Sequence, residues 1–179
     1  SIQTEKIDSA GNIIDVAAIT SIYRPGPLGA DVDKLYMKAK KNPKDVVYEH
    51  ELVKELTEET YGFLIFQEQI AMLAHKLGKN LSLDEGNKLR KLLTKKGTGE
   101  VQEQKDKIWC KFRDGCQIAG MTPSDAKELW DKFEYFSGYG FNKSHSAAYA
   151  LIAYQTAWLK AHYPAAFMAA VLSADMDNT

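Results

Sequence analysis

Residues 138–146 constrain the fold of this chain most strongly, because they separate amphipathic helical patterns from an apolar helical pattern. They read Gly-Tyr-Gly-Phe-Asn-Lys-Ser-His-Ser. Glycine lets the backbone approach another group closely, and the polar residues then open a helix whose first N–H groups carry a partial positive charge. Such a helix start suits a phosphate. The alternative is a plain corner between helices with Ser144 as N-cap.

The bulk composition indicates one globular domain, or a large subdomain of a bigger protein. The chain has 179 residues, of which 45% are hydrophobic and 26% charged, and its net charge is −1. A nucleic-acid site therefore requires a local basic patch. We find no apolar run long enough to span a bilayer and no signal peptide, so we expect no membrane partner and a cytoplasmic location.

Cysteine and histidine spacing favours neither a disulfide nor a metal site. Cys110 and Cys116 fall on different faces of a helix and lack the Cys-x-x-Cys spacing typical of zinc. We therefore expect two reduced thiols. His50, His75 and His162 show no ligand spacing, and we interpret them as structural or surface residues.

Apolar periodicity and capping residues predict an all-α fold with long irregular loops and little or no β structure. Ser82 and Glu85 form a predicted capping box, and Thr122 is a predicted N-cap before a proline. Residues 23–27 contain two prolines and a glycine, so we expect no helix there. The predicted helices cover residues 15–22, 30–41, 49–57, 63–77, 82–94, 101–119, 123–136, 144–161 and 163–174.

The two ends of the chain suggest a piece of a longer protein. It begins without methionine and ends without a terminating cap. We interpret residues 1–14 as a linker, or as an edge toward a neighbouring domain, and residues 15–179 as one helical domain. No internal repeat is evident.

A basic run on the predicted helix 82–94 is the first candidate for binding. Lys88, Arg90, Lys91, Lys95 and Lys96 occur with no acidic residue between them. Because Lys88, Lys91 and Lys95 are three and four residues apart, they share one helix face that could follow a line of phosphates. A solvated helix face is the alternative.

Two further segments carry polar residues in unusual places. Arg24 lies in the rigid segment 23–27, where it suits a bidentate phosphate contact; pairing with a carboxylate is the alternative. Gln67, Glu68 and Gln69 interrupt an apolar helical pattern. We interpret these three as buried residues that are hydrogen-bonded for structural reasons.

Two motifs that resemble catalytic sites are weak. Asp175 and Asp177 have the spacing of a metal-binding pair, but a single pair at a chain end is poor support for two-metal chemistry. Ser144 and His145 are neighbours, and adjacent helix residues point apart. We therefore reject a hydrolase triad.

Several motifs together resemble the fingers region of the C-family DNA polymerases, the family of the bacterial replicative polymerase III alpha subunit. They occur in the family's order over nearly the whole chain. The motifs are Tyr-Arg-Pro-Gly-Pro-Leu at 23–28, Tyr-Gly at 61–62 with Gln-Glu-Gln at 67–69, Leu-Arg-Lys at 89–91 with Lys-Lys at 95–96, Gly-Tyr-Gly-Phe-Asn-Lys-Ser-His-Ser-Ala-Ala-Tyr at 138–149, Tyr-Gln-Thr to Tyr-Pro at 154–164, and Ala-Asp-Met-Asp-Asn-Thr at 174–179.

The resemblance implies a fingers domain of a DNA-directed DNA polymerase that acts in replication by two-metal nucleotidyl transfer. The family's catalytic aspartates lie in a palm domain that precedes the fingers. We therefore expect no catalytic residue, metal ligand or cofactor in this chain, Mg²⁺ only in the full enzyme, and no activity from the fragment alone. Asp175 and Asp177 are not assigned a catalytic role.

The resemblance also implies the site residues and the partners. Lys91 stands where an arginine is common in the family, so a bidentate contact becomes a point charge. The expected nucleotide-binding residues are Arg24, Arg90, Lys91, Tyr139, Asn142, Lys143, Ser144 and His145, with Phe141 beside them, and the expected DNA-binding residues are Lys88, Lys95 and Lys96. The expected partners are a dNTP, template-primer DNA, the palm and, in the full-length protein, the sliding clamp and other replisome subunits.

Two alternatives stay open at this point. The chain could be a stand-alone helical module that binds nucleic acid or protein without catalysis, or a purely structural bundle.

The segment 95–100 departs from the family pattern. It is shorter and richer in glycine than the lysine- and proline-rich version usual in the family.

Overall fold

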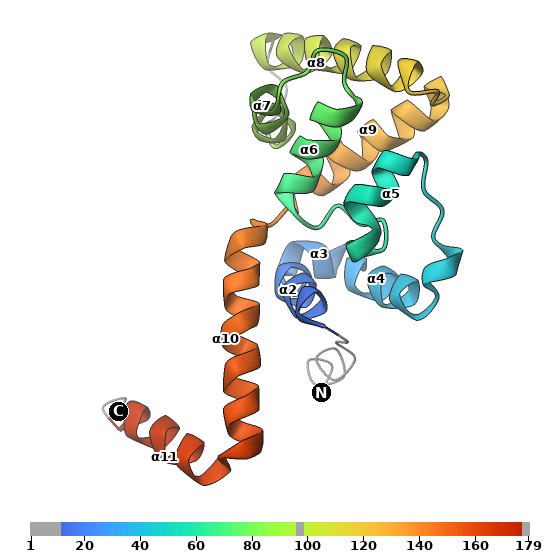
Figure 1. Cartoon of the computed structure of the whole chain (residues 1–179). Coiled ribbons are helices and arrows are strands. Elements are labelled where there is room, and N and C mark those ends of the chain that lie inside the picture. The colour runs from blue at the N-terminus through green and yellow to red at the C-terminus, as the bar shows by residue number, and fades with distance from the viewer. Residues whose placement is uncertain (1–11, 96–98, 177–179) are drawn as a thin grey trace.

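The computed structural model describes residues 12–95 and 99–176, and this part of the chain is built from helices without a β-sheet (Figure 1). The all-α expectation is confirmed. Residues 1–11, which hold most of the predicted linker, lie outside the described residues. The elements are α2 (Ile13–Ile22), α3 (Pro25–Gly29), α4 (Val32–Lys41), the short 3-10 helix η1 (Pro43–Asp45), α5 (Glu51–Thr57), the 3-10 helix η2 (Glu58–Thr60), α6 (Gln67–Leu77), α7 (Leu83–Leu93), α8 (Gly99–Ile118), α9 (Pro123–Ser137), α10 (Lys143–His162) and α11 (Pro164–Asp175).

Two apolar clusters form the core. The larger cluster lies among α5 to α9, in the upper part of Figure 1, and buries Phe112 and Phe133 completely. The smaller cluster joins α2, α4 and the segment before α6 around Tyr36 and Phe66. Phe136 packs against both clusters, so the end of α9 lies where the two halves meet.

Helix α7 lies very close to α6 because Gly86 has no side chain. A Cβ atom at Gly86 would come within 2.5 Å of the carbonyl oxygen of Ala71 on α6. The capping box predicted at the start of α7 is confirmed: the Ser82 hydroxyl accepts from the Glu85 N–H, and the Glu85 carboxylate accepts from the Ser82 N–H. These contacts fix the helix that carries the basic run.

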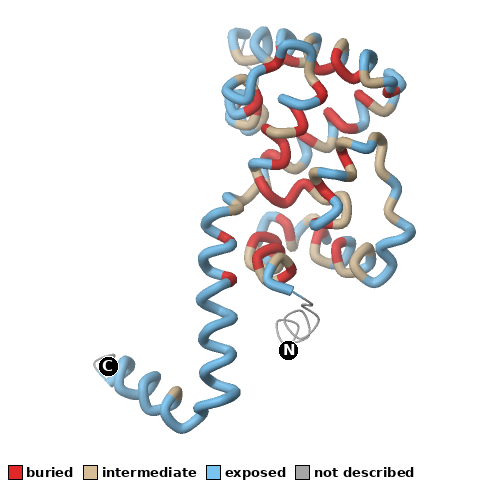
Figure 2. The backbone as a smooth tube through the Cα atoms, in the orientation of Figure 1, coloured by how far each residue is buried: buried red, intermediate tan, exposed pale blue. Residues whose placement is uncertain are grey.

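The helix pair α10–α11 forms an arm that leaves the body beside α2 (Figure 1). Only Ser146 and Ala150 are buried on α10, and no residue is buried on α11 (Figure 2). The Ser146 hydroxyl donates to the Ala17 carbonyl at 2.5 Å and lies 2.9 Å from the Ser21 hydroxyl. The small side chains of Ala17, Ser21, Ser146 and Ala150 therefore let α2 and α10 pack closely against each other.

The predicted helix 63–77 begins four residues too early. Residues 63–65 are not helical, Phe66 is extended, and α6 starts at Gln67. Leu64 faces the larger cluster while Ile65 and Phe66 belong to the smaller one, so this segment is buried on both sides. The Ile65 carbonyl accepts from the Phe141 N–H at 2.9 Å, so this oxygen is used in a contact with a distant segment rather than in a helical hydrogen bond.

Two other local expectations are wrong. The segment 23–27 was expected to be non-helical, yet Pro25 opens the short helix α3. Proline is tolerated in the first turn, where the N–H has no helical partner. The N-cap of α10 is Asn142 rather than Ser144: the Asn142 side-chain oxygen accepts from the His145 N–H at 2.8 Å.

The remaining helices agree with the expected segments within a few residues. Thr122 caps α9 and forms a capping box with Asp125. His50 and His75 make structural hydrogen bonds, as interpreted, to the backbone of Leu52 and Leu81. Both cysteines are free; burial raises the pKa of the Cys116 thiol to about 12.

Candidate functional site

The loop between α9 and α10 is held against the start of α6 by backbone hydrogen bonds. The Phe141 N–H donates to the Ile65 carbonyl at 2.9 Å, and the Gln67 N–H donates to the Phe141 carbonyl at 2.9 Å. Phe66 and Phe141 thus form an isolated parallel bridge. The glycine-rich loop of residues 138–141 is therefore held at the junction of the two clusters by backbone hydrogen bonds of the kind found between strands.

Arg24 holds this loop from the side of α3. Its Nε donates to the Ser21 carbonyl at 2.8 Å, its Nη2 donates to the Tyr139 carbonyl, and its guanidinium lies 4.9 Å from the centre of the Phe141 ring. Burial lowers the pKa of the Arg24 guanidinium. These partners are all neutral, so the positive charge of Arg24 is not cancelled by them.

Arg90 approaches the same loop from α7. Its Nη1 donates to the Gln67 side-chain oxygen, and the Gln67 side-chain nitrogen donates to the Gly140 carbonyl at 2.9 Å. Arg90 is half-buried, whereas Lys91 beside it is exposed. Two arginines that are far apart in the sequence are therefore linked to one short loop, Arg24 directly and Arg90 through Gln67.

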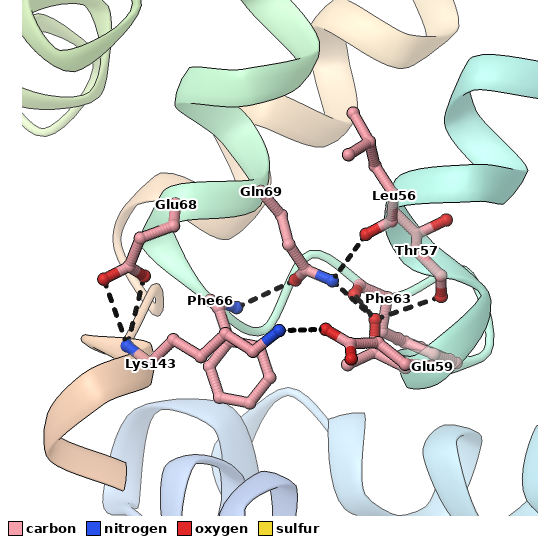
Figure 3. A network of polar contacts seen from close by, with 9 residues as sticks. Leu56, Thr57, Glu59, Phe63, Phe66, Glu68, Gln69 and Lys143 are labelled. Carbon is pink, nitrogen blue, oxygen red and sulfur yellow. Dashed lines mark hydrogen bonds and ion pairs between the residues drawn. The ribbon is translucent and has the colours of Figure 1, made fainter. Parts of the chain in front are cut away.

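The start of α10 is occupied by a carboxylate of the chain itself. Glu68 accepts from the Lys143 backbone N–H at 3.1 and 3.2 Å and from the Asn142 side-chain nitrogen at 3.0 Å. The ammonium of Lys143 pairs with Glu59 and lies 5.5 Å from the centre of the Phe66 ring. Figure 3 shows Glu59 and Glu68 both reaching Lys143. A negative charge is what a helix N-terminus favours.

Aromatic rings continue from the loop along the exposed side of α10. The His145 ring lies 5.5 Å from the Phe141 ring and 4.6 Å from the Tyr149 ring, measured between ring centres. His145 and Tyr149 are exposed. This row provides a surface on which a planar group can stack.

The structure brings most of the expected nucleotide-binding residues together. Arg24, Tyr139, Asn142, Lys143 and His145 lie in or against the loop, and Arg90 reaches it through Gln67, as the contacts above show. Ser144 follows them as an exposed residue of α10.

The expected DNA-binding residues lie apart from this constellation. Lys88 and Lys95 are exposed on and just after α7, and within the described residues no hydrogen bond or ion pair joins them to the loop. The same holds for Lys91, which was expected to bind nucleotide. Lys96 lies outside the described residues, as does most of the link between α7 and α8.

Gln67 and Glu68 are site residues that the sequence analysis did not identify. Only Gln69 of the three polar residues is buried for structure, as interpreted: its side chain accepts from the Phe66 N–H and donates to Thr60 and the Leu56 carbonyl (Figure 3). Gln67 and Glu68 face the loop instead. The available signal was their position in the first turn of an apolar helix, where backbone N–H groups lack helical partners and bond to neighbouring groups instead.

Other candidate groups do not form a site in the described part of the chain. No three or more His, Cys, Asp or Glu side chains lie close enough there to hold a metal ion. Asp175 ends α11, and Asp177 lies outside the described residues. None of the helices described is both long enough and apolar enough to cross a bilayer.

Comparison with known proteins assigns the chain to a class. A family model described as the bacterial DNA polymerase III alpha subunit finger domain matches residues 7–115. The DNA polymerase III subunit alpha of Xylella fastidiosa strain Temecula1 is 44% identical over 165 residues, which are 92% of this chain and 13% of that protein. The protein of the same name from Escherichia coli K12 is 42% identical over 170 residues, covering 92% of this chain and 14% of that protein.

The chain belongs to the family of bacterial DNA polymerase III alpha subunits, and it contains their finger domain. The resemblance noted in the sequence is confirmed. A match that covers 92% of the chain includes the loop before α10, which lies beyond the family model. The chain spans about a seventh of the length of these relatives, 13–14%.

Proposed function

We propose that this fingers domain binds the triphosphate of an incoming dNTP and helps to hold template-primer DNA in a replicative polymerase. The observation that carries the proposal is that Arg24 donates to the Tyr139 carbonyl while Arg90 is linked to the Gly140 carbonyl through Gln67. Both guanidiniums donate to neutral oxygens. A phosphate offers them charged acceptors, and hydrogen bonds between charged partners are stronger.

Glu68 disfavours a triphosphate at the start of α10 and so favours a position beside the arginines. Because its carboxylate is bonded to the first N–H of α10, a phosphate at that helix start would have to displace it. The triphosphate is therefore better accommodated beside the arginines, with the exposed Lys91 as a further point charge. The start of α10 then borders the pocket rather than holding the phosphates.

The aromatic row of α10 supports a position for the nucleotide base. Phe141, His145 and Tyr149 follow one another from the loop outward. Every base has a flat face that stacks on such rings with little sequence preference. This suits a polymerase, because the pocket must accept all four bases while pairing with the template selects among them.

Three lysines of and after α7 are assigned to the DNA backbone. Lys88 is exposed on the helix, and Lys95 and Lys96 follow the helix in the sequence. Lysine contacts to phosphates add affinity without reading sequence and weaken as salt rises.

The metal chemistry is assigned to a palm domain outside this chain. Two Mg²⁺ ions held by palm carboxylates would supply the activation of the primer end and stabilise the leaving pyrophosphate. The residues of this chain would bind and orient the triphosphate by preorganised positive charge. The exposed apolar arm of α10 and α11 suits contact with the rest of the polymerase chain.

Nucleotide titration tests the proposal. We expect the variant Arg90→Ala with Lys91→Ala to bind a fluorescent dNTP at least about tenfold more weakly, since two cationic phosphate contacts are lost. Arg113→Ala is the matched control, because Arg113 is an exposed arginine on α8 that pairs with Asp114. Equal affinity of all three proteins would favour a structural bundle instead.

Primer extension separates the polymerase from a stand-alone module. The isolated chain is expected to add no nucleotide to a primer, whereas the full-length polymerase containing it is active. Extension by the isolated chain would show that the catalytic carboxylates are not confined to the palm.

A further inference from the structure

Gln67 is the one described residue whose side chain joins an arginine of the proposed nucleotide site to the loop. Its side-chain oxygen accepts from Arg90 Nη1, and its side-chain nitrogen donates to the Gly140 carbonyl at 2.9 Å. Its backbone N–H donates to the Phe141 carbonyl at 2.9 Å. The side-chain oxygen, the side-chain nitrogen and the backbone N–H of Gln67 are therefore all hydrogen-bonded, the first to Arg90 and the other two to the loop.

The loop is packed too closely against Gln67 for the side chain to move freely. A Cβ atom at Gly140 would lie 2.9 Å from Gln67 Cγ. Only a glycine allows the loop backbone to approach this near. The amide of Gln67 is consequently fixed, and the acceptor that it offers to Arg90 has a fixed position.

Arg90 depends on this acceptor for its orientation. Within the described residues, the buried Nε of Arg90 has no hydrogen-bond partner, so the bond from Nη1 to Gln67 is the contact that sets the plane of the guanidinium. Since the guanidinium is planar and its donors form a rigid fork, one fixed bond limits the directions of the others.

We propose that Gln67 is a positioning residue that orients Arg90 beside the loop of residues 139–141 so that the remaining Nη N–H groups of the guanidinium can bind the triphosphate. The inference rests on the proposed function. A neutral amide suits this task because it orients the guanidinium without cancelling its charge. A carboxylate at the same place would form a charge-assisted pair with Arg90 and compete with the phosphate.

Steady-state insertion of one nucleotide by the full-length polymerase tests this. Gln67→Met removes both amide groups but keeps the length of the side chain and the backbone bond to Phe141. We expect KM for the dNTP to rise about tenfold with kcat changed less than about twofold, because a ground-state contact to a charged group is weakened. Gln102→Met is the control, since Gln102 is exposed on α8 and, among the described residues, its side chain donates to Asp106.

A double-mutant cycle shows whether Gln67 acts through Arg90. We expect Arg90→Ala to raise KM by itself, and Gln67→Met to add nothing further in that background. An equal rise in both backgrounds would mean that Gln67 acts by holding the loop, which overturns the inference. If Arg90→Ala raises KM and Gln67→Met does not, the inference fails while the proposed function stands. If Arg90→Ala has no effect, the proposed function itself fails.

A second variant keeps the test decisive if Gln67→Met does not fold. Gln67→Glu keeps an acceptor for Arg90 and replaces the amide by a charge. We expect the KM of this variant for the dNTP to rise more than the KM of Gln67→Met, by over about tenfold, because the carboxylate competes with the triphosphate for the guanidinium. An unchanged KM in this variant would also overturn the inference.

Discussion

At the scale of single residues, the site depends on cations whose partners are neutral. Arg24 and Arg90 both donate to carbonyl or amide oxygens, whereas Lys143 pairs with Glu59. The first two keep their charge available to an anion. Lys143 is already neutralised by its partner, so its main effect is on the position of the loop.

Arg24→Lys is expected to weaken both the loop and nucleotide binding. Arg24 reaches the Ser21 and Tyr139 carbonyls with two different nitrogens, and a lysine ammonium cannot reproduce this planar fork. We expect a loss of about 1 kcal/mol in the free energy of unfolding, measured by denaturant titration. Arg113→Lys is the control on an exposed arginine. Equal stability of Arg24→Lys and the parent would show that the two carbonyl contacts contribute nothing.

Glu85 links the stability of α7 to pH. The hydrogen bond from Lys111 and, next, that from the Ser82 backbone lower the pKa of Glu85 below its usual 4.5. The carboxylate therefore stabilises the fold above the unfolded-state pKa, and this contribution is lost as pH falls through the lower folded-state pKa. We expect Glu85→Gln to lower the free energy of unfolding by about 0.5 kcal/mol at neutral pH and by nothing at strongly acidic pH. A difference that stays constant with pH would contradict this.

At the scale of secondary-structure elements, the close packing of α6 and α7 places Arg90 beside Gln67. We expect Gly86→Ala to destabilise the protein by about 2 kcal/mol, because its Cβ would lie 2.5 Å from the Ala71 carbonyl oxygen. The shift of α7 would also weaken dNTP binding. Gly99→Ala on α8 is the control, because a Cβ there meets nothing within 4 Å in the part of the chain that the structure describes. Thermal unfolding of the two variants measures the difference, and equal melting temperatures would contradict the account.

The helices could be predicted where capping and periodicity act within one turn. Ser82 with Glu85, and Thr122 with Asp125, specify their helix starts through contacts three residues apart. The non-helical segment 63–66 could not be predicted in the same way. Its conformation depends on Phe141, more than seventy positions later in the chain, and on two clusters that take its side chains in different directions.

The candidate site could be predicted in part for the same reason. Its cations stand out in the sequence because Arg24 and Arg90 lie in recognisable motifs. Their neutral and acidic partners do not stand out. Gln67 and Glu68 resemble ordinary residues at the start of a helix, and only the packing of the loop against α6 shows that they bond to Gly140 and Lys143.

At the scale of the whole molecule, the body and the arm differ in how their apolar residues are used. The body buries its apolar residues in two joined clusters, whereas the arm exposes a dense set of them. This set comprises Tyr149, Leu151, Ile152, Tyr154, Trp158, Leu159, Tyr163, Met168, Val171, Leu172 and Met176. Exposed apolar surface of this extent is typical of a contact region with another part of an assembly.

Shortening the arm is expected to reduce self-association of the isolated chain without lowering its melting temperature much. A variant that ends at Ile152 keeps Ser146 and Ala150, the buried anchors of α10. We expect its melting temperature to stay within about 3 °C of the parent, since few buried contacts are lost, and its self-association to decrease. Light scattering and thermal unfolding measure both. A large fall in melting temperature would show that the arm stabilises the body.

The central claim is that Arg90 contacts the phosphates of a nucleotide rather than its base or sugar. The most direct measurement compares the dissociation constants of a dNTP and the matching dNMP for the full-length polymerase and for its Arg90→Ala variant, with Arg113→Ala as control. We expect Arg90→Ala to weaken dNTP binding about tenfold and dNMP binding far less, because most of the lost contacts are to the outer phosphates. Equal weakening of both ligands, or of neither, would contradict the account.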